Sequence, residues 1–273
     1  MAADTALYNV STTNSSFEAE IRRLYNQASF SPQKELNILH QFGLKDGMSV
    51  LELGSGPGFV SEWLSGAVPN GSLTCLELDP ALIEYSEQYL KTKSRSAYRI
   101  VQGSILEMEF PDSTFDFAFA RLVFVHMKDP VRAAKEVLRV LKPAGKLVVS
   151  DTDFALNHIT DPHMPEVQPL LEKILTYQVS RGRPVMFGRR LWHILKLAGF
   201  RDIEIEAVVA HSGEKGIEWF YPQIDPDRIA PLIKEGVLSE EEMGVYRAAV
   251  ENLMASDDPF YMRLLLMTAG EKP

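Results

Sequence analysis

Apolar and polar positions follow two patterns along the chain, one typical of strands and one typical of helices. Short, almost wholly apolar runs bounded by turn residues predict strands at residues 48–53, 72–78, 98–102, 115–120 and 146–150. Apolar residues three and four positions apart predict helices between them, at residues 59–68, 80–90 and 129–141. Apolar strands that alternate with helices predict a parallel sheet covered on both faces, the doubly wound α/β class.

The segment before this core follows another pattern. Residues 1–16 are small and polar, so we expect a mobile tail there. Residues 17–45 carry apolar positions at helical spacing and predict an N-terminal helical cap. Ser31 and Pro32 are expected to start its second helix, with Ser31 as the N-cap.

We expect one domain over residues 46–273, which continues after the fifth strand with further helices and strands. Residues 160–198 have a helical pattern and end at Gly199 and Phe200. Two late strands are then expected, at 203–209 and 262–269, and their succession predicts that one is antiparallel. In the first of them the alternation predicts one buried face, formed by Ile203, Ile205, Ala207 and Val209.

Between these two strands lies a predicted helical insertion, residues 211–258, which the sheet does not need. The sequence Ser239-Glu240-Glu241-Glu242 within it predicts a capped helix start. An insertion of this length near strand ends is typical of a lid over a substrate pocket, and a surface subdomain or oligomer contact is the alternative.

Composition and charge narrow the class of protein. The chain has 273 residues, of which 45% are apolar and 24% charged, so it can bury a hydrophobic core without disulfides or a structural metal. Its net charge of −9 disfavours nucleic acid and anionic membranes as partners. Its single cysteine, Cys75, excludes an intrachain disulfide and a Cys-rich zinc site. With neither a signal peptide nor a membrane-spanning run in this sequence, we expect a cytoplasmic protein without a metal.

The candidate site is the glycine-rich junction Leu51-Glu52-Leu53-Gly54-Ser55-Gly56-Pro57-Gly58, between the first strand and its helix. Glycine permits a tight turn there and a close approach of ligand to backbone, although a plain glycine-rich turn remains the alternative. Dinucleotide-binding proteins use G-x-G-x-x-G, whereas here Phe59 stands at the third glycine position, which argues against NAD.

Acidic residues follow at the end of the second strand. Glu77 lies 23 residues after Gly54, where a carboxylate can accept hydrogen bonds from both hydroxyls of a ribose. Asp79 precedes Pro80, and we predict that it is the N-cap of the next helix.

With these motifs the chain resembles the class I S-adenosylmethionine-dependent methyltransferases. The likeness covers about residues 35–209 and rests on four stretches in the right order: Val50–Gly58, Leu76–Pro80, Gln102–Asp116 and Arg139–Leu147. The resemblance implies a seven-stranded, Rossmann-like sheet with a reversed last strand. It also implies S-adenosylmethionine as the cofactor.

The resemblance further implies roles for individual residues in cofactor binding. The methionine part of the cofactor would lie along Gly54, Ser55, Gly56 and Gly58, with its methyl end near Arg121. Glu77 would bind the ribose. The adenine would contact Leu78, Ser104 and Ile105. Two departures matter. Ser104 stands where many relatives have Asp. The sequence after the fourth strand lacks the Asn/Asp-Pro-Pro-aromatic motif, which argues against nucleobases and protein amides as acceptors.

Candidate acceptor-side residues are few. His126, after the fourth strand, is the candidate general base, and a packing or capping role is the alternative. Tyr25, Phe154, His158 and Trp219 are candidates for the substrate pocket, and core packing is the alternative for the aromatic ones.

These observations predict methyl transfer from S-adenosylmethionine to an oxygen or nitrogen of a small organic acceptor. Two alternatives stay open: a methyltransferase for a protein or quinone acceptor, and a non-catalytic or repurposed cofactor-binding member of the same fold. A homodimer is also left open.

Overall fold

The computed structural model of the chain describes residues 16–157 and 159–273 and divides into two compact units. The sheet unit comprises the described residues up to Asp151 together with 188–208 and 266–273. The helical unit comprises the described residues of 152–187 and 209–265. The expected tail lies outside the described residues except for Ser16. Within the described ranges, every helix is too short or too polar to cross a membrane.

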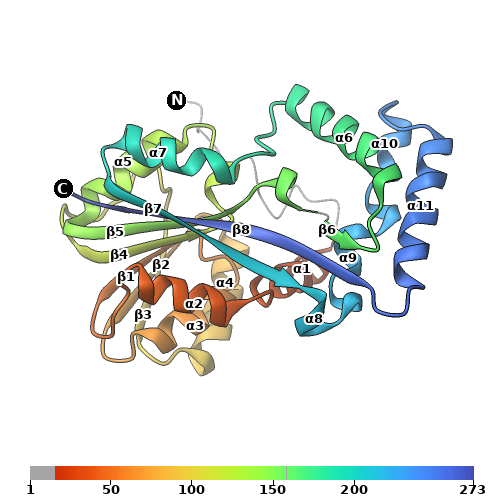
Figure 1. The fold of residues 1–273 in the computed structure, drawn as a ribbon. Helices are drawn as coiled ribbons and strands as arrows, with labels where there is room; N and C mark the ends of the chain where they lie inside the picture. Colours follow the sequence, from red (N-terminus) through yellow and green to blue (C-terminus); the bar gives the residue numbers. More distant parts are fainter. Residues whose placement is uncertain (1–15, 158) are drawn as a thin grey trace. The chain divides into compact units, whose positions relative to one another are not determined.

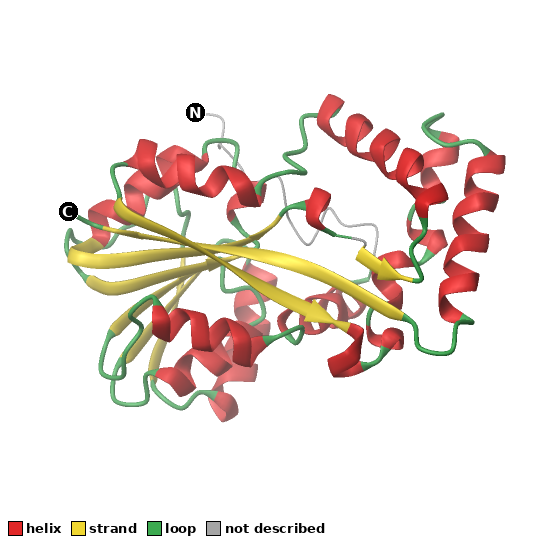
Figure 2. Cartoon of the chain, in the orientation of Figure 1, coloured by secondary structure: helices red, strands yellow, loops and turns green. Residues whose placement is uncertain are grey.

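The sheet has the strand order β3-β2-β1-β4-β5-β8-β6, and β7 also pairs with β8 (Figure 2). The strands are β1 Ser49–Leu53, β2 Ser72–Glu77, β3 Ala97–Gln102, β4 Phe115–Arg121, β5 Leu141–Thr152, β6 Ile159–Asp161, β7 Arg201–His211 and β8 Phe260–Glu271. The first five are parallel, as expected. β8 runs antiparallel to β5, because Lys272 exchanges backbone hydrogen bonds with Ala144 and Gly145 at the start of β5. The doubly wound class is therefore confirmed, and the short β6 raises the number of described strands to eight.

Helices cover both faces of the sheet in the sheet unit. They are α1 Phe17–Ala28, α2 Pro32–Gln41, α3 Phe59–Ala67, α4 Pro80–Lys93, α5 Pro130–Val140 and α7 Leu191–Ala198. Figure 1 shows α2, α3 and α4 on one face and α5 and α7 on the other. Because both faces are covered, most residues of the central strands are buried, with Leu51 and Phe119 fully inaccessible.

The helical unit contains α6 Gln168–Ser180, α8 Ser212–Lys215, α9 Tyr221–Ile224, α10 Pro231–Lys234 and α11 Glu240–Met254. The predicted start of α11 is confirmed, since the Ser239 hydroxyl accepts from the Glu242 amide and the Glu242 carboxylate accepts from the Ser239 amide. An ion pair between Lys173 and Glu242 joins α6 to α11.

Two local expectations were wrong, and a third was confirmed only in part. Residues 160–198 are not continuously helical: β6 precedes α6, and the chain turns at Gly182, which has φ +73°, before α7. β5 begins at Leu141 rather than 146, because residues 142–145 bulge while Leu141 still pairs with Phe115. Ser31 and Pro32 do start α2, with Ser31 at the N-cap position, but the Ser31 hydroxyl donates to the carbonyl of Phe30 and makes no capping hydrogen bond.

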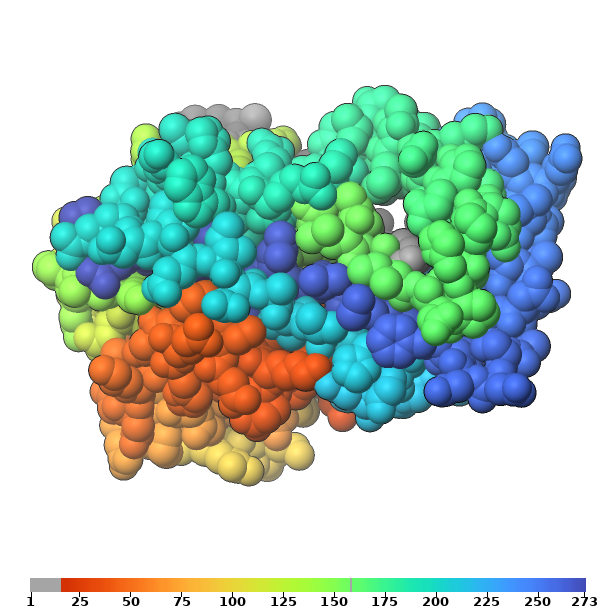
Figure 3. Space-filling model, viewed as in Figure 1, coloured from red at the N-terminus to blue at the C-terminus, as the bar shows by residue number. Residues whose placement is uncertain are grey.

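The predicted buried face of β7 was also wrong. Val208 and Ala210 are the buried residues, and Ile205 is 43% exposed. Among the described strands β7 pairs only with β8, and residues 201–207 are exposed or only partly buried on both faces. Figure 3 shows part of this strand at the molecular surface. Alternation alone could not reveal which face would meet the core.

Candidate cofactor and active site

The glycine-rich loop connects β1 to α3 through three left-handed glycines. Gly54, Gly56 and Gly58 have φ values of +63°, +55° and +87°, which side-chain-bearing residues rarely adopt. A Cβ atom on Gly54 would lie 2.7 Å from a methyl group of Val123, so the loop packs directly on the segment after β4. A Cβ atom on Gly56 would meet no atom within 4 Å, so the space beside this glycine is open.

Ser55 lies inside this loop with an unsatisfied hydroxyl. Its side chain is 5% exposed, and its Oγ finds no hydrogen-bond partner among the described residues. Buried polar atoms without a partner are rare in native proteins and indicate a site for a ligand or water. The open space at Gly56 and this hydroxyl together fit a polar ligand lying along the loop.

Glu77 ends β2 beside the loop and is rigidly held. Its Oε2 accepts from the Gly56 amide at 2.7 Å, and its Oε1 accepts from the amides of Leu78 and Asp79 at 2.8 and 3.0 Å. Each carboxylate oxygen can accept two hydrogen bonds, so Oε2 keeps capacity for a ligand hydroxyl. Asp79 accepts from the Ala81 amide at 2.9 Å, which confirms its prediction as the N-cap of α4.

Leu78, Ser104 and Ile105 lie at the neighbouring strand ends. Leu78 is 45% exposed, so part of its side chain is accessible to a flat apolar ligand. The Gly103 amide donates to the Glu77 carbonyl at 2.9 Å and joins the two segments. Ile105 is buried, and the Ser104 hydroxyl accepts from the Leu106 amide at 3.2 Å.

Arg121, at the end of β4, forms a buried ion pair with Glu35 of α2. Its Nε lies 2.8 Å from one Glu35 oxygen, and its Nη2 donates to the other at 2.9 Å and to the Gln27 carbonyl at 2.9 Å. Both side chains are almost inaccessible. Sequence analysis missed Glu35, because a single acidic residue 86 positions away carries no local signal. Arg121 therefore has only Nη1 left for a ligand, according to its contacts among the described residues.

His126 lies on the single turn η2 Phe124–His126, after β4. The turn is held by the buried Asp151 carboxylate, which accepts from the Val125 amide at 2.9 Å. Burial, together with the nearby positive charge of Arg23 on α1, lowers the pKa of His126 below 6.5. The imidazole is therefore mostly neutral at pH 7 and can accept a proton.

Three of the four candidate substrate residues are described, and they are divided between the units. Tyr25 belongs to the sheet unit, where its half-exposed ring packs edge-on against Phe59 at 5.2 Å, next to the glycine-rich loop. Phe154 lies in the helical unit on η3 Phe154–Leu156 and is 39% exposed. Trp219 lies in the same unit on η6 Ile217–Trp219, with Lys215 Nζ 4.8 Å from its ring centre. His158 lies outside the described residues.

Glu52, another buried carboxyl group, lies in the middle of β1. The Ser61 hydroxyl donates to Glu52 Oε2 at 2.5 Å, and burial raises the pKa of Glu52 to about 8. Glu52 is therefore mostly protonated at pH 7. The sequence alone gives no sign of this, because Glu52 occupies a strand position like its apolar neighbours.

Comparisons with known proteins agree with this geometry. Residues 51–149 match the methyltransferase-domain family. Sterol 24-C-methyltransferase of Aspergillus fumigatus is 33% identical over 187 residues, 68% of this chain and 48% of that protein. Demethylmenaquinone methyltransferase of Staphylococcus aureus is 31% identical over 133 residues, 48% of this chain and 54% of that protein. The chain thus spans about half the length of these curated relatives.

Solved structures show the same fold. Phosphoethanolamine N-methyltransferase 2 of Haemonchus contortus aligns with a TM-score of 0.54 and 20% identity, over 88% of this chain and 52% of that one. Its structures contain S-adenosylhomocysteine or S-adenosylmethionine. The sheet order, the glycine-rich loop and the family match lead to one conclusion: residues 51–149 form a methyltransferase domain, and the sheet has the fold of the class I S-adenosylmethionine-dependent methyltransferases.

Proposed function

We propose that the chain transfers a methyl group from S-adenosylmethionine to an oxygen or nitrogen atom of a small organic acceptor. The observation that carries the proposal is the loop itself, with its unsatisfied Ser55 hydroxyl and the open space at Gly56. The ordered Glu77 carboxylate beside that space supports it. When bound, the cofactor supplies a methyl group already activated on a sulfonium.

The chain's own residues then have three tasks. The glycine-rich loop and Glu77 hold the cofactor, and Leu78 with Ser104 and Ile105 receives the adenine. Alignment of donor and acceptor alone can supply roughly 7–11 kcal/mol of the barrier. His126, neutral at pH 7, takes a proton from an acceptor hydroxyl or ammonium group, which contributes about 10²–10⁴-fold.

The names of two relatives favour a second candidate, an apolar acceptor such as a sterol or a prenylated quinone. Methylation of such an acceptor would use the same cofactor site, so the two candidates differ only on the acceptor side. Both remain proposals for this chain.

The test is methyl transfer from labelled S-adenosylmethionine to a panel of amines, phenols, carboxylic acids, sterols and prenylated quinones. A labelled product among the first three classes supports the main proposal, and one among the last two supports the second. Cofactor binding without transfer to any acceptor would instead favour a non-catalytic or repurposed member of the family. If His126 is the base, His126→Gln removes the acidic limb of the kcat profile, expected below pH 6.5.

A further inference from the structure

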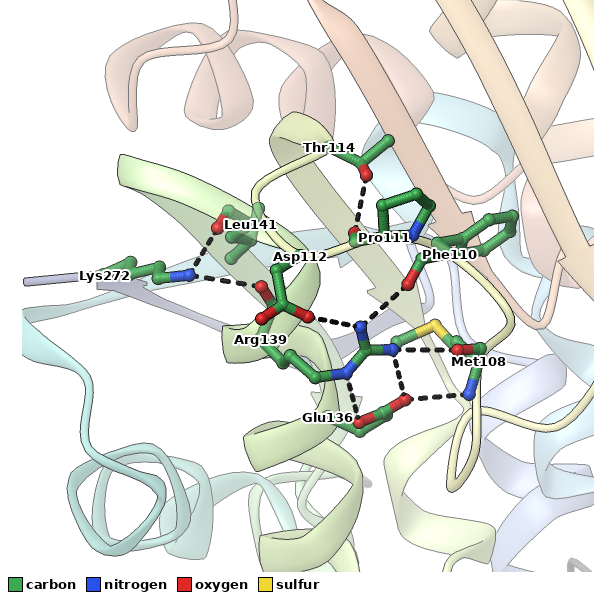
Figure 4. Close-up of polar contacts among 9 residues, drawn as sticks. All are labelled: Met108, Phe110, Pro111, Asp112, Thr114, Glu136, Arg139, Leu141 and Lys272. Atoms are coloured by element: carbon green, nitrogen blue, oxygen red, sulfur yellow. Dashed lines mark hydrogen bonds and ion pairs between the residues drawn. The ribbon is translucent and has the colours of Figure 1, made fainter.

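A polar cluster around Arg139 joins α5 to the segment between β3 and β4 (Figure 4). Arg139 Nη1 donates to the Phe110 carbonyl at 2.7 Å and to Asp112 Oδ1 at 2.8 Å. Its Nη2 donates to the Met108 carbonyl at 2.8 Å. One guanidinium therefore holds acceptors on three alternate residues of a segment that has no helix or strand of its own.

Glu136, one turn earlier on α5, completes the cluster. It accepts from Arg139 Nε at 3.0 Å and from Nη2 at 2.7 Å, and it also accepts from the Met108 amide at 2.8 Å. Both backbone polar groups of Met108 are thus fixed by side chains of α5. The fork geometry of arginine allows this, whereas a lysine ammonium could not bridge the same acceptors.

The segment that Arg139 holds begins at the candidate adenine side. Ser104 and Ile105 lie four and three residues before Met108. A turn over residues 104–107 connects them to it, and in this turn the Glu107 amide donates a hydrogen bond to the Ser104 carbonyl at 3.3 Å. Upstream, the same stretch is tied to β2 through the Gly103 amide. Its downstream anchor is the cluster on α5. A segment with few backbone hydrogen bonds of its own takes its position from such anchors.

The end of α5 does not depend on the Arg139 side chain. Lys272 Nζ donates to the carbonyls of Arg139 and Leu141 at 3.2 and 2.6 Å, and the Ser113 amide donates to the Arg139 carbonyl at 3.1 Å. These contacts involve only the backbone of residue 139. Truncation of its side chain therefore removes the contacts with the Met108 and Phe110 carbonyls and with Asp112. The Glu136 carboxylate still accepts from the Met108 amide, and the helix end stays in place.

We propose that Arg139 is a positioning residue for cofactor binding, which holds residues 108–112 so that Ser104 and Ile105 are ordered to receive the adenine. The inference rests on the proposed function. It predicts that the Arg139 side chain, in the last turn of α5 and without contact to the ligand, controls cofactor affinity.

The test is calorimetric titration of S-adenosylhomocysteine into the full chain and its variants, well below their unfolding midpoints. Arg139→Ala is expected to weaken binding at least tenfold. The matched control is Lys142→Ala, which breaks the partly exposed ion pair with Asp116 but touches none of residues 108–112, and it is expected to change affinity less than twofold. If Arg139→Ala does not fold, Arg139→Lys keeps a charge beside Glu136 and is expected to weaken binding to a smaller extent.

A double-mutant cycle with Ser104→Ala separates positioning from general destabilisation. Loss through a shared segment is not additive, so the double variant should bind more tightly than the product of the two single losses predicts. Additive losses, or unchanged affinity in Arg139→Ala and Arg139→Lys, would overturn the inference. Failure of the wild-type chain to bind S-adenosylhomocysteine would instead overturn the proposed function.

Discussion

The Glu77 carboxylate is the single group on which cofactor binding should depend most. Hydrogen bonds to a charged group contribute roughly 1.5–3 kcal/mol each, so Glu77→Ala should weaken S-adenosylhomocysteine binding at least about tenfold. Because Glu77 also accepts from the Gly56 amide, the loss includes some disorder of the loop. Asp79→Ala is the control, since Asp79 caps α4 and should leave affinity nearly unchanged. Equal losses in the two variants, measured by calorimetry, would remove Glu77 from the site.

The buried Glu52 should make stability depend on pH. Its pKa is raised to about 8 in the folded chain, against 4.5 as its ordinary value, so the folded state prefers the protonated form. Its contribution is complete below pH 4.5 and is lost as pH rises toward 8, by at most about 1.4 kcal/mol per pH unit. Urea unfolding at pH 5, 6.5 and 8 should show this slope in the wild type and a flatter one in Glu52→Gln. Parallel curves for the two proteins would contradict the assignment.

At the scale of elements, the ion pair between Glu35 and Arg121 should fix α2 to the end of β4. Removing one partner of a buried pair leaves an uncompensated charge and typically costs about 3–5 kcal/mol, so Glu35→Ala should be strongly destabilising. Breaking the partly exposed pair of Lys142 and Asp116 should cost no more than about 1 kcal/mol. Urea unfolding of Glu35→Ala and Lys142→Ala gives the comparison. Similar losses would mean that the buried pair does not stabilise this junction.

The elements themselves were largely predictable from sequence. The parallel strands and their helices were located to within a few residues where apolar runs end at glycine or at Asp-Pro, as at Asp79 and Asp129. Prediction failed where tertiary contacts decide. The buried face of β7 depends on which of its side chains other elements cover, and the bulge at 142–145 depends on pairing with β4.

Site prediction shows the same division. The glycine-rich loop and Glu77 could be found because their chemistry is local in sequence. Glu35 and Asp151 could not be assigned partners, because their contacts with Arg121 and Val125 exist only after the strands assemble. The unsatisfied Ser55 hydroxyl likewise becomes visible only once its surroundings are packed.

At the scale of the whole molecule, we predict that the helical unit selects the acceptor and leaves cofactor affinity to the sheet unit. Trp219→Ala should raise the acceptor KM or lower kcat, while affinity for S-adenosylhomocysteine changes less than about threefold, or ~0.7 kcal/mol. Steady-state kinetics and calorimetry on this one variant test the separation. The oligomer alternative predicts an altered mass in light scattering with acceptor kinetics preserved, and equal damage to cofactor and acceptor binding would contradict the lid hypothesis.

The central claim is that the strand ends around the glycine-rich loop bind S-adenosylmethionine and not a dinucleotide. Titration calorimetry of the wild-type chain with S-adenosylhomocysteine and, separately, with NAD tests it most directly. We predict saturable binding of one S-adenosylhomocysteine per chain and no measurable heat from NAD at the same concentrations. Binding of NAD, or the absence of S-adenosylhomocysteine binding by a folded chain, would contradict the account.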